Sequence, residues 1–285
     1  MIYIPIFGAL LEASGMTIEK ILLKKKSLNY KNYTALGFLA IIIVMLPLIF
    51  FLWKIEPEAY QLKNLLIFFF IILSSIFANL FTFYSLKRKD LNVIEPIRLM
   101  QPLFTILLAF ILSFFFQTYS SERNWSILIL GLIACIALIA SHVEKHHLAF
   151  DKYIISALLG SLFFAIELVS SKFILQYYNS FTFYFLRCLF ILLITWVIFK
   201  PKLKINLKTE LAILLVGIIW VIYRVILYYG YEIYGVVFTT ILFILTPVFI
   251  YIFAGIFLKE KLSVKNIISA VIIVACVAAA IIIES

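Results

Sequence analysis

The sequence predicts an all-α integral membrane protein, in which ten transmembrane helices form two inverted five-helix repeats. Three observations lead to this prediction: the composition, the lengths of the apolar segments and a similarity between the two halves. Hydrophobic residues make up 65% of the 285 residues and charged residues only 13%. Soluble domains are about 45–50% apolar and about 25% charged. A water-soluble fold has too little interior for so much apolar surface.

Ten apolar segments have roughly the length that a helix needs to cross a bilayer, about 20 residues. Their apolar runs are continuous, which favours helices over the alternating pattern of a β-barrel. The expected spans are 2–23, 34–53, 65–86, 92–116 and 125–141 in the first half, and 153–175, 181–199, 211–231, 236–258 and 264–283 in the second. The fourth span contains Pro96 and Pro102 and is expected to bend or tilt.

The largest polar interruption, residues 142–152, divides the chain into two sets of five spans. We therefore expect two domains, 1–143 and 144–285, each a five-helix repeat. Four matches between the halves occur in the same order: "GALLEASGMTIE" (8–19) with "SALLGSLFFAIE" (156–167), "FANLFTFYS" (77–85) with "IYRVILYYG" (222–230), Pro102 with Pro247, and "ACIALIA" (134–140) with "ACVAAAI" (275–281). Together they predict an internal repeat.

The basic residues predict the orientation of these repeats. Because each half holds an odd number of spans, the second half enters the membrane upside down relative to the first. Seventeen lysines and arginines then lie in loops on one side, against only Lys54, Lys63, Arg123 and Lys172 on the other. The positive-inside rule makes the basic side cytoplasmic and places both termini outside. The net charge of +10 is thus read as a topology signal in a multi-pass cell-membrane protein, and no nucleic-acid partner is expected.

Ionisable side chains inside the expected spans are the main functional candidates. They are Glu12, Glu19, Glu95, Arg98, Glu167, Arg187 and Arg224. A charge at the bilayer centre costs at least about 2.5–3.5 kcal/mol on insertion scales, so such a group is paired, hydrated or functional. Glu12 and Glu19 lie about two turns apart and share a helix face, which we expect to look into the bundle.

Two roles are open for these groups. Glu12 and Glu167 could carry protons or bind positive groups, while Arg187 and Arg224 could bind negative groups. Alternatively, they form structural ion pairs, for example Glu167 with either arginine. Arg98 could simply pair with Glu95, one turn away.

Other polar and helix-breaking residues complete the expected site. Asn79 could add hydrogen bonds, and Tyr229 belongs to a tyrosine group that could line a site or form an interfacial belt. Pro102 and Pro247 are expected helix breaks at matching places in the two halves, the pattern that points to a central transport site. The expected substrate-binding residues are Glu12, Glu19, Asn79, Arg98, Glu167, Arg187, Arg224 and Tyr229.

Signals for catalysis or cofactors are weak. His142, His146 and His147 lie in the central loop without further residues at metal-ligand spacing. The chain has no Gly-rich phosphate loop and no nucleophile motif. The three cysteines lie within apolar runs and are read as small buried hydrophobes. We therefore expect no catalytic residue, no metal and no cofactor.

The segment "LFILTPVFIYIFAGIFLKEKLSVKNIISAVIIVACVAAAIIIE" (242–284) carries a family resemblance. Its proline-bearing ninth span, its "LKEKLS" turn and its small-residue tenth span resemble the EamA-like branch of the drug/metabolite transporter superfamily. The resemblance implies transport of small metabolites, often export of amino acids or related compounds. Two features depart from the family: Ser269 and Ala275–Cys276 stand where glycine is frequent, and relatives usually keep both termini in the cytoplasm.

The expected function is secondary active export of a small polar metabolite, such as an amino acid or a related compound, by alternating access. The expected partners are this substrate, membrane lipids and protons as a candidate coupling ion, with the chain a monomer or a homodimer. Two alternatives stay open. A membrane-embedded lipid-modifying enzyme would need clustered His or Asp near an interface. A non-transporting lipid-binding scaffold would have a sealed core with all charges paired.

Overall fold

The computed structural model describes residues 3–24, 28–88, 97–142, 151–201, 206–257 and 263–284. The first half contains α1 (Tyr3–Lys24), α2 (Tyr30–Leu52), η1 (Pro57–Tyr60), α3 (Leu62–Arg88), α5 (Met100–Leu112), η2 (Gln117–Glu122) and α6 (Trp125–His142). The second half contains α7 (Lys152–Leu175), α8 (Ser180–Phe199), α9 (Leu207–Ile233), α10 (Val236–Phe243), α11 (Thr246–Phe257) and α12 (Val264–Glu284). The prediction of an all-α fold is confirmed for these residues.

Within the described ranges, seven helical segments are long and apolar enough to cross a membrane. They are α2, α3, α7, α8, α9, α12 and the combined segment Val236–Phe253 of α10 and α11. The shorter helices α5 and α6 are also apolar, and the continuous helix α1 contains the acidic residues Glu12 and Glu19. The count of ten spans and the two-repeat architecture stay predictions.

Side-chain caps explain where three second-half helices begin. The Asp151 carboxylate accepts from two backbone N–H groups at the start of α7. Asn179 and Asn206 do the same for one N–H group each at the starts of α8 and α9. These caps satisfy donors that the first turn of a helix leaves unpaired.

Two helices differ from the expected spans, and both contain a proline. Of the span expected at 92–116, the structure has α5 over Met100–Leu112, while Pro96 lies outside the described residues. The span expected at 236–258 is divided into α10 and α11 at positions 244–245. Pro102 and Pro247 lie in the first turns of α5 and α11, where the absent N–H removes no helical hydrogen bond.

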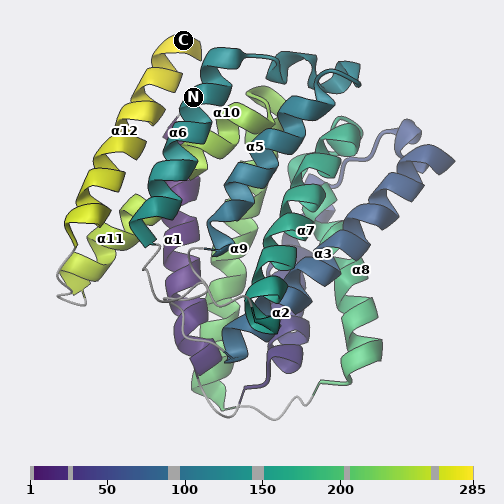
Figure 1. Ribbon diagram of the computed structural model, residues 1–285. Helices are drawn as coiled ribbons and strands as arrows, with labels where there is room; N and C mark the ends of the chain where they lie inside the picture. The colour runs from purple at the N-terminus through teal and green to yellow at the C-terminus, as the bar shows by residue number, and fades with distance from the viewer. Residues whose placement is uncertain are drawn as a thin grey trace.

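The most extensive helix contacts join the two halves of the chain. Figure 1 shows α3 alongside α7 and α6 beside α12, and further contacts join α1 to α9 and α2 to both α8 and α9. Small residues allow close approach: Gly160 of α7 lies against the backbone of α3, and Gly217 of α9 against the backbone of α2. The halves therefore interleave, and a site at the centre draws side chains from both.

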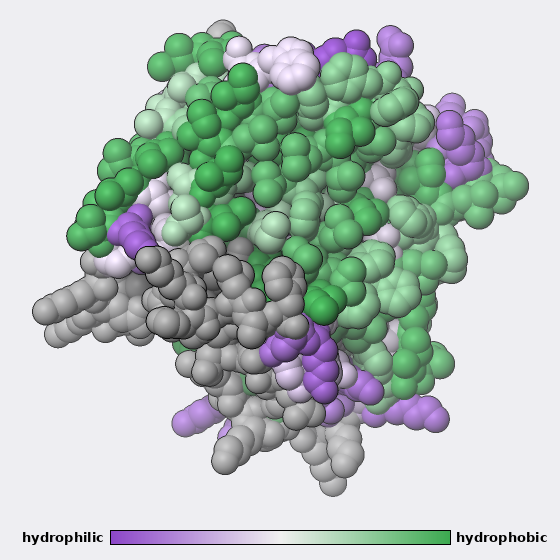
Figure 2. Space-filling model, in the orientation of Figure 1, coloured by the Kyte–Doolittle hydropathy of each residue, from purple (hydrophilic) through white to green (hydrophobic). Residues whose placement is uncertain are grey.

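Large apolar side chains cover much of the outer surface. Phe50, Phe51, Phe115 and Ile282 are between 74% and 86% exposed. Figure 2 shows hydrophobic residues over most of the visible face, with hydrophilic residues mainly toward its upper and lower ends. An apolar surface of this extent marks a protein that meets another apolar phase. It fits the hydrocarbon of a bilayer.

Two ends of the bundle can be named from their charged residues. At the basic end, Lys31 lies 5.7 Å from the Phe199 ring centroid, and Lys152 begins α7. At the opposite end, the Lys54 backbone contacts the start of α8, and Lys172 contacts η2. These four lysines divide between the ends as the predicted topology requires, while the membrane orientation stays a prediction.

Candidate functional site

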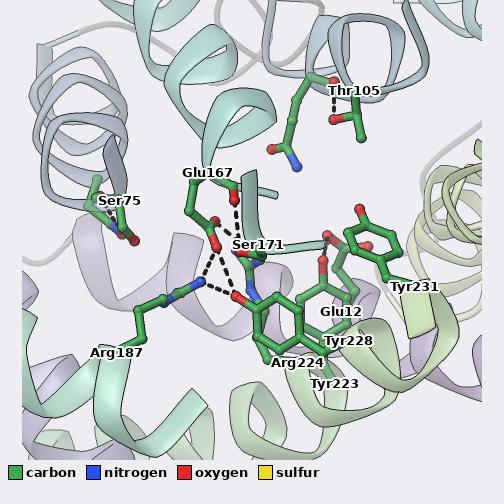
Figure 3. A network of polar contacts seen from close by, with 12 residues as sticks. Glu12, Ser75, Thr105, Glu167, Ser171, Arg187, Tyr223, Arg224, Tyr228 and Tyr231 are labelled. Atoms are coloured by element: carbon green, nitrogen blue, oxygen red, sulfur yellow. Dashed lines mark hydrogen bonds and ion pairs between the residues drawn. The ribbon is translucent and has the colours of Figure 1, made fainter. Parts of the chain in front are cut away.

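Four side chains from three helices form a buried polar cluster at the centre of the bundle, the Glu167 cluster. It consists of Glu167 from α7, Arg187 from α8, and Arg224 and Tyr228 from α9 (Figure 3). Arg187 Nη1 donates to Glu167 Oε1, which also accepts from the Tyr228 hydroxyl at 2.8 Å. None of the four is more than 6% exposed. The cluster thus places one carboxylate among two guanidinium groups and a hydroxyl.

Arg224 contacts Glu167 less closely than Arg187 does. Its Nη1 lies 3.6 Å from Glu167 Oε2, which is beyond the usual hydrogen-bond distance. Neither of these two atoms has a hydrogen-bond partner among the described residues. The Arg224 guanidinium also lies 5.5 Å from the Tyr223 ring centroid and 5.9 Å from that of Phe164, within the range of a cation–π interaction.

Glu12 of α1 lies near this cluster but is held by hydroxyl groups. Its Oε1 accepts from the Tyr223 hydroxyl at 2.8 Å, and its Oε2 accepts from Thr246 Oγ1 at 2.7 Å. Figure 3 shows Glu12 and Tyr223 side by side, close to Tyr228 and Tyr231. The carboxylate therefore links α1 to α9 and to the first residue of α11, directly after the helix break.

A cavity of about 80 Å³ lies between the Glu167 cluster and the basic end. Its polar lining consists of Glu19, Tyr33, Thr34, Asn79, Thr82, Arg98, Tyr184, Arg187 and Arg224. Its other lining residues are Gly37, Phe38, Ile41, Phe83, Phe164, Val216, Gly217 and Trp220. The volume is several times the space that one water molecule needs, so the cavity can take a small polar group.

Most of the expected site residues meet in this region. Glu19, Asn79, Arg98, Arg187 and Arg224 line the cavity. Glu19 accepts a hydrogen bond from the Tyr33 hydroxyl at 2.9 Å. The Asn79 amide donates to a backbone carbonyl of its own helix at 2.7 Å.

The remaining expected residues have other places. Glu12 and Glu167 contact residues of the central region without lining the cavity, whereas Tyr229 takes no part in either the cavity lining or the cluster. The expected pair of Glu95 with Arg98 lies outside the described residues, because Glu95 is not described.

Sequence reasoning missed several residues of the site. Tyr33, Tyr184 and Trp220 line the cavity, and Thr246 binds Glu12. A signal existed for Trp220, since it precedes Arg224 by four residues and shares its helix face. Thr246 had no comparable signal, because its partner lies more than 200 residues away in the chain.

A second buried polar network lies toward the opposite end. The Glu122 carboxylate of η2 accepts from the backbone N–H groups of Val236 and Val237 at 2.7 and 2.8 Å, and it pairs with Lys172 of α7. Glu122 is only 4% exposed. Its charge lies at the start of α10, where a helix favours anions. We call this contact the Glu122 latch, because it ties η2, α7 and α10 together.

No group of three or more His, Cys, Asp or Glu side chains that could hold a metal is found in the part of the chain that the structure describes. His146 and His147 lie outside that part. Cys135, Cys188 and Cys276 are buried and unpaired, as expected for small core residues.

An apolar belt around a bundle of helices, with buried ionisable groups at a central cavity, defines a multi-pass membrane protein. Comparison with known proteins finds a family similarity. The model of the EamA-like transporter family matches residues 151–282, which confirms the resemblance seen in the sequence. Members of that family are membrane transporters of the drug/metabolite superfamily.

Structural comparison agrees on the fold. A solved structure, described as "Crystal structure of protein", matches with a TM-score of 0.74 and 15% sequence identity, covering 98% of this chain and 96% of that chain. At this identity the match shows a shared fold alone. No curated protein sequence matches the chain.

Proposed function

We propose that the protein is a secondary transporter that exports a small polar metabolite, such as an amino acid or a related compound, by alternating access. The observation that carries the proposal is the central cavity, where arginines from α8 and α9 meet polar residues of α1, α2 and α3. A sealed scaffold would have no cavity at its buried charges, whereas Arg187 and Arg224 here both line one.

The helix pairing supports two interchangeable halves. If the expected repeat is correct, α1, α2, α3 and α6 correspond to α7, α8, α9 and α12. The contact of α1 with α9 then corresponds to that of α7 with α3, while α2 with α8 and α6 with α12 are self-corresponding. Such an exchange of roles between two halves is what alternating access around a central site requires.

The position of the cavity supports export. Its lining residues on α2 and α9 lie in the parts of these helices that face the basic end. That end is cytoplasmic by the positive-inside rule. At the other end, the Glu122 latch ties η2, α7 and α10 together. This arrangement corresponds to a state that receives its substrate from the cytoplasm of a cell-membrane protein.

Glu12 and Glu167 are the candidate proton carriers. Both are carboxylates near the bundle centre, and both bind hydroxyl groups that could donate to or accept from them after a change of protonation. Coupling to a proton gradient would supply the energy of transport. No second protomer contributes to this site in the proposal, so it holds for a monomer and for each subunit of a homodimer.

Binding and flux measurements test this function. The purified chain is screened by thermal shift against amino acids, nucleosides, sugar phosphates and polyamines, because a ligand that binds the folded state raises its stability. Compounds that stabilise the chain are then loaded as radiolabelled solutes into liposomes with and without a pH gradient. We expect flux that responds to the gradient.

Variants assign the roles. Glu12→Gln and Glu167→Gln are expected to abolish the response to pH. Lys63→Gln, a substitution of an exposed residue at the start of α3, is expected to leave flux unchanged. Failure of every stabilising compound to cross the bilayer would overturn transport. Gradient-dependent flux in both glutamine variants would remove these two residues from the mechanism.

A further inference from the structure

The guanidinium groups at the cavity keep nitrogen atoms that bond to nothing in the described part of the chain. Arg224 Nη1 and Arg187 Nε are both buried and lack a hydrogen-bond partner. Arg187 is 2% exposed and Arg224 6%. A buried donor without an acceptor is energetically costly, and a charged donor more so. The site is therefore incomplete on its cationic side.

The nearby carboxylates do not complete it. Glu12 takes its hydrogen bonds from Tyr223 and Thr246, and Glu19 takes one from Tyr33. Among the described residues, only Glu167 lies within ion-pair distance of the two central arginines. Glu12 and Glu19 are thus held by neutral hydroxyls, while two guanidinium groups share the Glu167 carboxylate, whose Oε2 also has no hydrogen-bond partner among the described residues.

The side chains that carry these nitrogen atoms lie at the cavity. Arg187 and Arg224 both line it, together with Arg98. The apolar part of the lining includes the rings of Phe83, Phe164 and Trp220. A guanidinium group is a planar donor that matches two oxygens of a carboxylate or a phosphate, and aromatic rings suit a flat or apolar body attached to such a group.

We propose that the cavity selects small organic anions, with a carboxylate or a phosphate seated against Arg224 and the rest of the solute among the aromatic rings. This inference rests on the proposed transport function and narrows its substrate class. The anion supplies the oxygen acceptors that Arg224 lacks. Cationic amines, which have no acceptor to offer, are excluded by the same groups.

Four probes with the same ring and different head groups test the selectivity. Phenylacetate carries a carboxylate, phenyl phosphate a phosphate, phenylalanine a zwitterionic head and phenethylamine an ammonium. Binding to the purified full-length chain is measured by thermal shift over a concentration series. We expect one or both of the anions to bind at least about tenfold more tightly than the amine, and the preferred anion tells carboxylate from phosphate. Tighter binding of phenethylamine than of either anion overturns the inference.

Variants connect the selectivity to the named arginine. Arg224→Gln is expected to weaken binding of the preferred anion about 10- to 100-fold, the loss of one or two charge-assisted hydrogen bonds. Arg224→Lys keeps the charge but loses the fork, so binding is expected to be intermediate. Lys63→Gln removes a positive charge at the surface and is expected to leave binding of the preferred anion unchanged. Unchanged anion binding in Arg224→Gln contradicts the proposal.

Two further readouts keep the test decisive. If Arg224→Gln does not fold, Arg98→Gln replaces it, because Arg98 lines the same cavity and is less buried. The same weakening of anion binding is expected.

Flux in liposomes separates the proposed transport function from the proposed anion selectivity. Flux of phenethylamine without flux of the anions keeps transport and overturns anion selectivity. Binding of anions without any flux supports the anion site and overturns transport.

Discussion

Arg224 Nη1 and Glu167 Oε2 lie 3.6 Å apart at the centre of the bundle, close enough for an ion pair but not for a hydrogen bond. Arg187 donates directly to the other oxygen of the same carboxylate. The Glu167 carboxylate thus pairs with two guanidinium groups, and it holds Arg187 more closely than Arg224. Arg224, which is held less closely, keeps Nη1 without a hydrogen bond among the described residues.

Glu167→Gln is expected to lower the free energy of unfolding by about 3–5 kcal/mol, because removing one partner of a buried ion pair leaves uncompensated charge inside. Here two guanidinium groups would lose their common anion. Denaturant unfolding of the purified chain in detergent micelles measures the change.

A double variant is the control for this prediction. Glu167→Gln combined with Arg187→Gln removes a buried cation as well, so it is expected to be less destabilised than the sum of the two single variants. A cost equal to that sum would mean that the two side chains do not interact in the folded protein.

Tyr223→Phe is expected to lower the free energy of unfolding by about 1.5–3 kcal/mol, since it removes a hydrogen bond to the Glu12 carboxylate. Thr246→Val, which removes the hydrogen bond to Glu12 Oε2, is expected to lower the free energy of unfolding by a similar amount. The matched control is Tyr60→Phe at a residue that is 64% exposed, where no change is expected. Equal stability of the Tyr223 and Tyr60 variants would show that the hydroxyl does not hold Glu12.

The sequence was sufficient to predict an all-α fold of apolar helices and to say that their central ionisable residues face inward. Apolar run length predicts a helix in a bilayer because the backbone must bond within the segment. A carboxylate or guanidinium in such a run must face away from the lipid, because a charge is unstable in hydrocarbon. Glu167, Arg187 and Arg224 are therefore predicted to face the interior of the bundle, and all three are buried.

Partners and helix breaks depend on contacts that hydropathy does not record. From sequence, Glu167 could pair with Arg187 or Arg224, and in the structure its side chain reaches both. The division between α10 and α11 falls within a continuous apolar run. Glu122 bonds to backbone groups more than 110 residues further along, and no local pattern indicates such a contact.

Glu122→Gln is expected to loosen the opposite end of the bundle. The amide carries no charge for Lys172, and it can accept fewer bonds from the start of α10 than a carboxylate can. The measurement uses Val236→Cys in a chain without its three native cysteines, labelled by a membrane-impermeant maleimide. Val236 is fully buried with the latch closed, so we expect labelling to become several-fold faster.

The control cysteine replaces Lys63, an exposed residue near the same end. Its labelling rate is expected to be the same with and without Glu122→Gln, because it does not depend on opening. A parallel rise at both positions would indicate general unfolding instead of an opened end.

Gly235→Ala and Gly37→Ala are expected to change stability in opposite directions. Gly235 has a φ of +87°, a conformation that side chains with a Cβ adopt at a cost of about 1–3 kcal/mol. A Cβ there would also lie 2.7 Å from a Glu122 oxygen. That oxygen cannot easily move away, because Lys172 and the Val236 N–H hold it.

Gly37 lies inside α2, and a Cβ there would meet no atom within 4 Å. Alanine at that position is expected to raise the free energy of unfolding by up to about 1 kcal/mol, through its better helix propensity. Denaturant unfolding of both variants measures the difference. A stabilised Gly235→Ala would mean that the backbone at the start of α10 does not need a positive φ, and the geometry of the Glu122 latch would then have to be different.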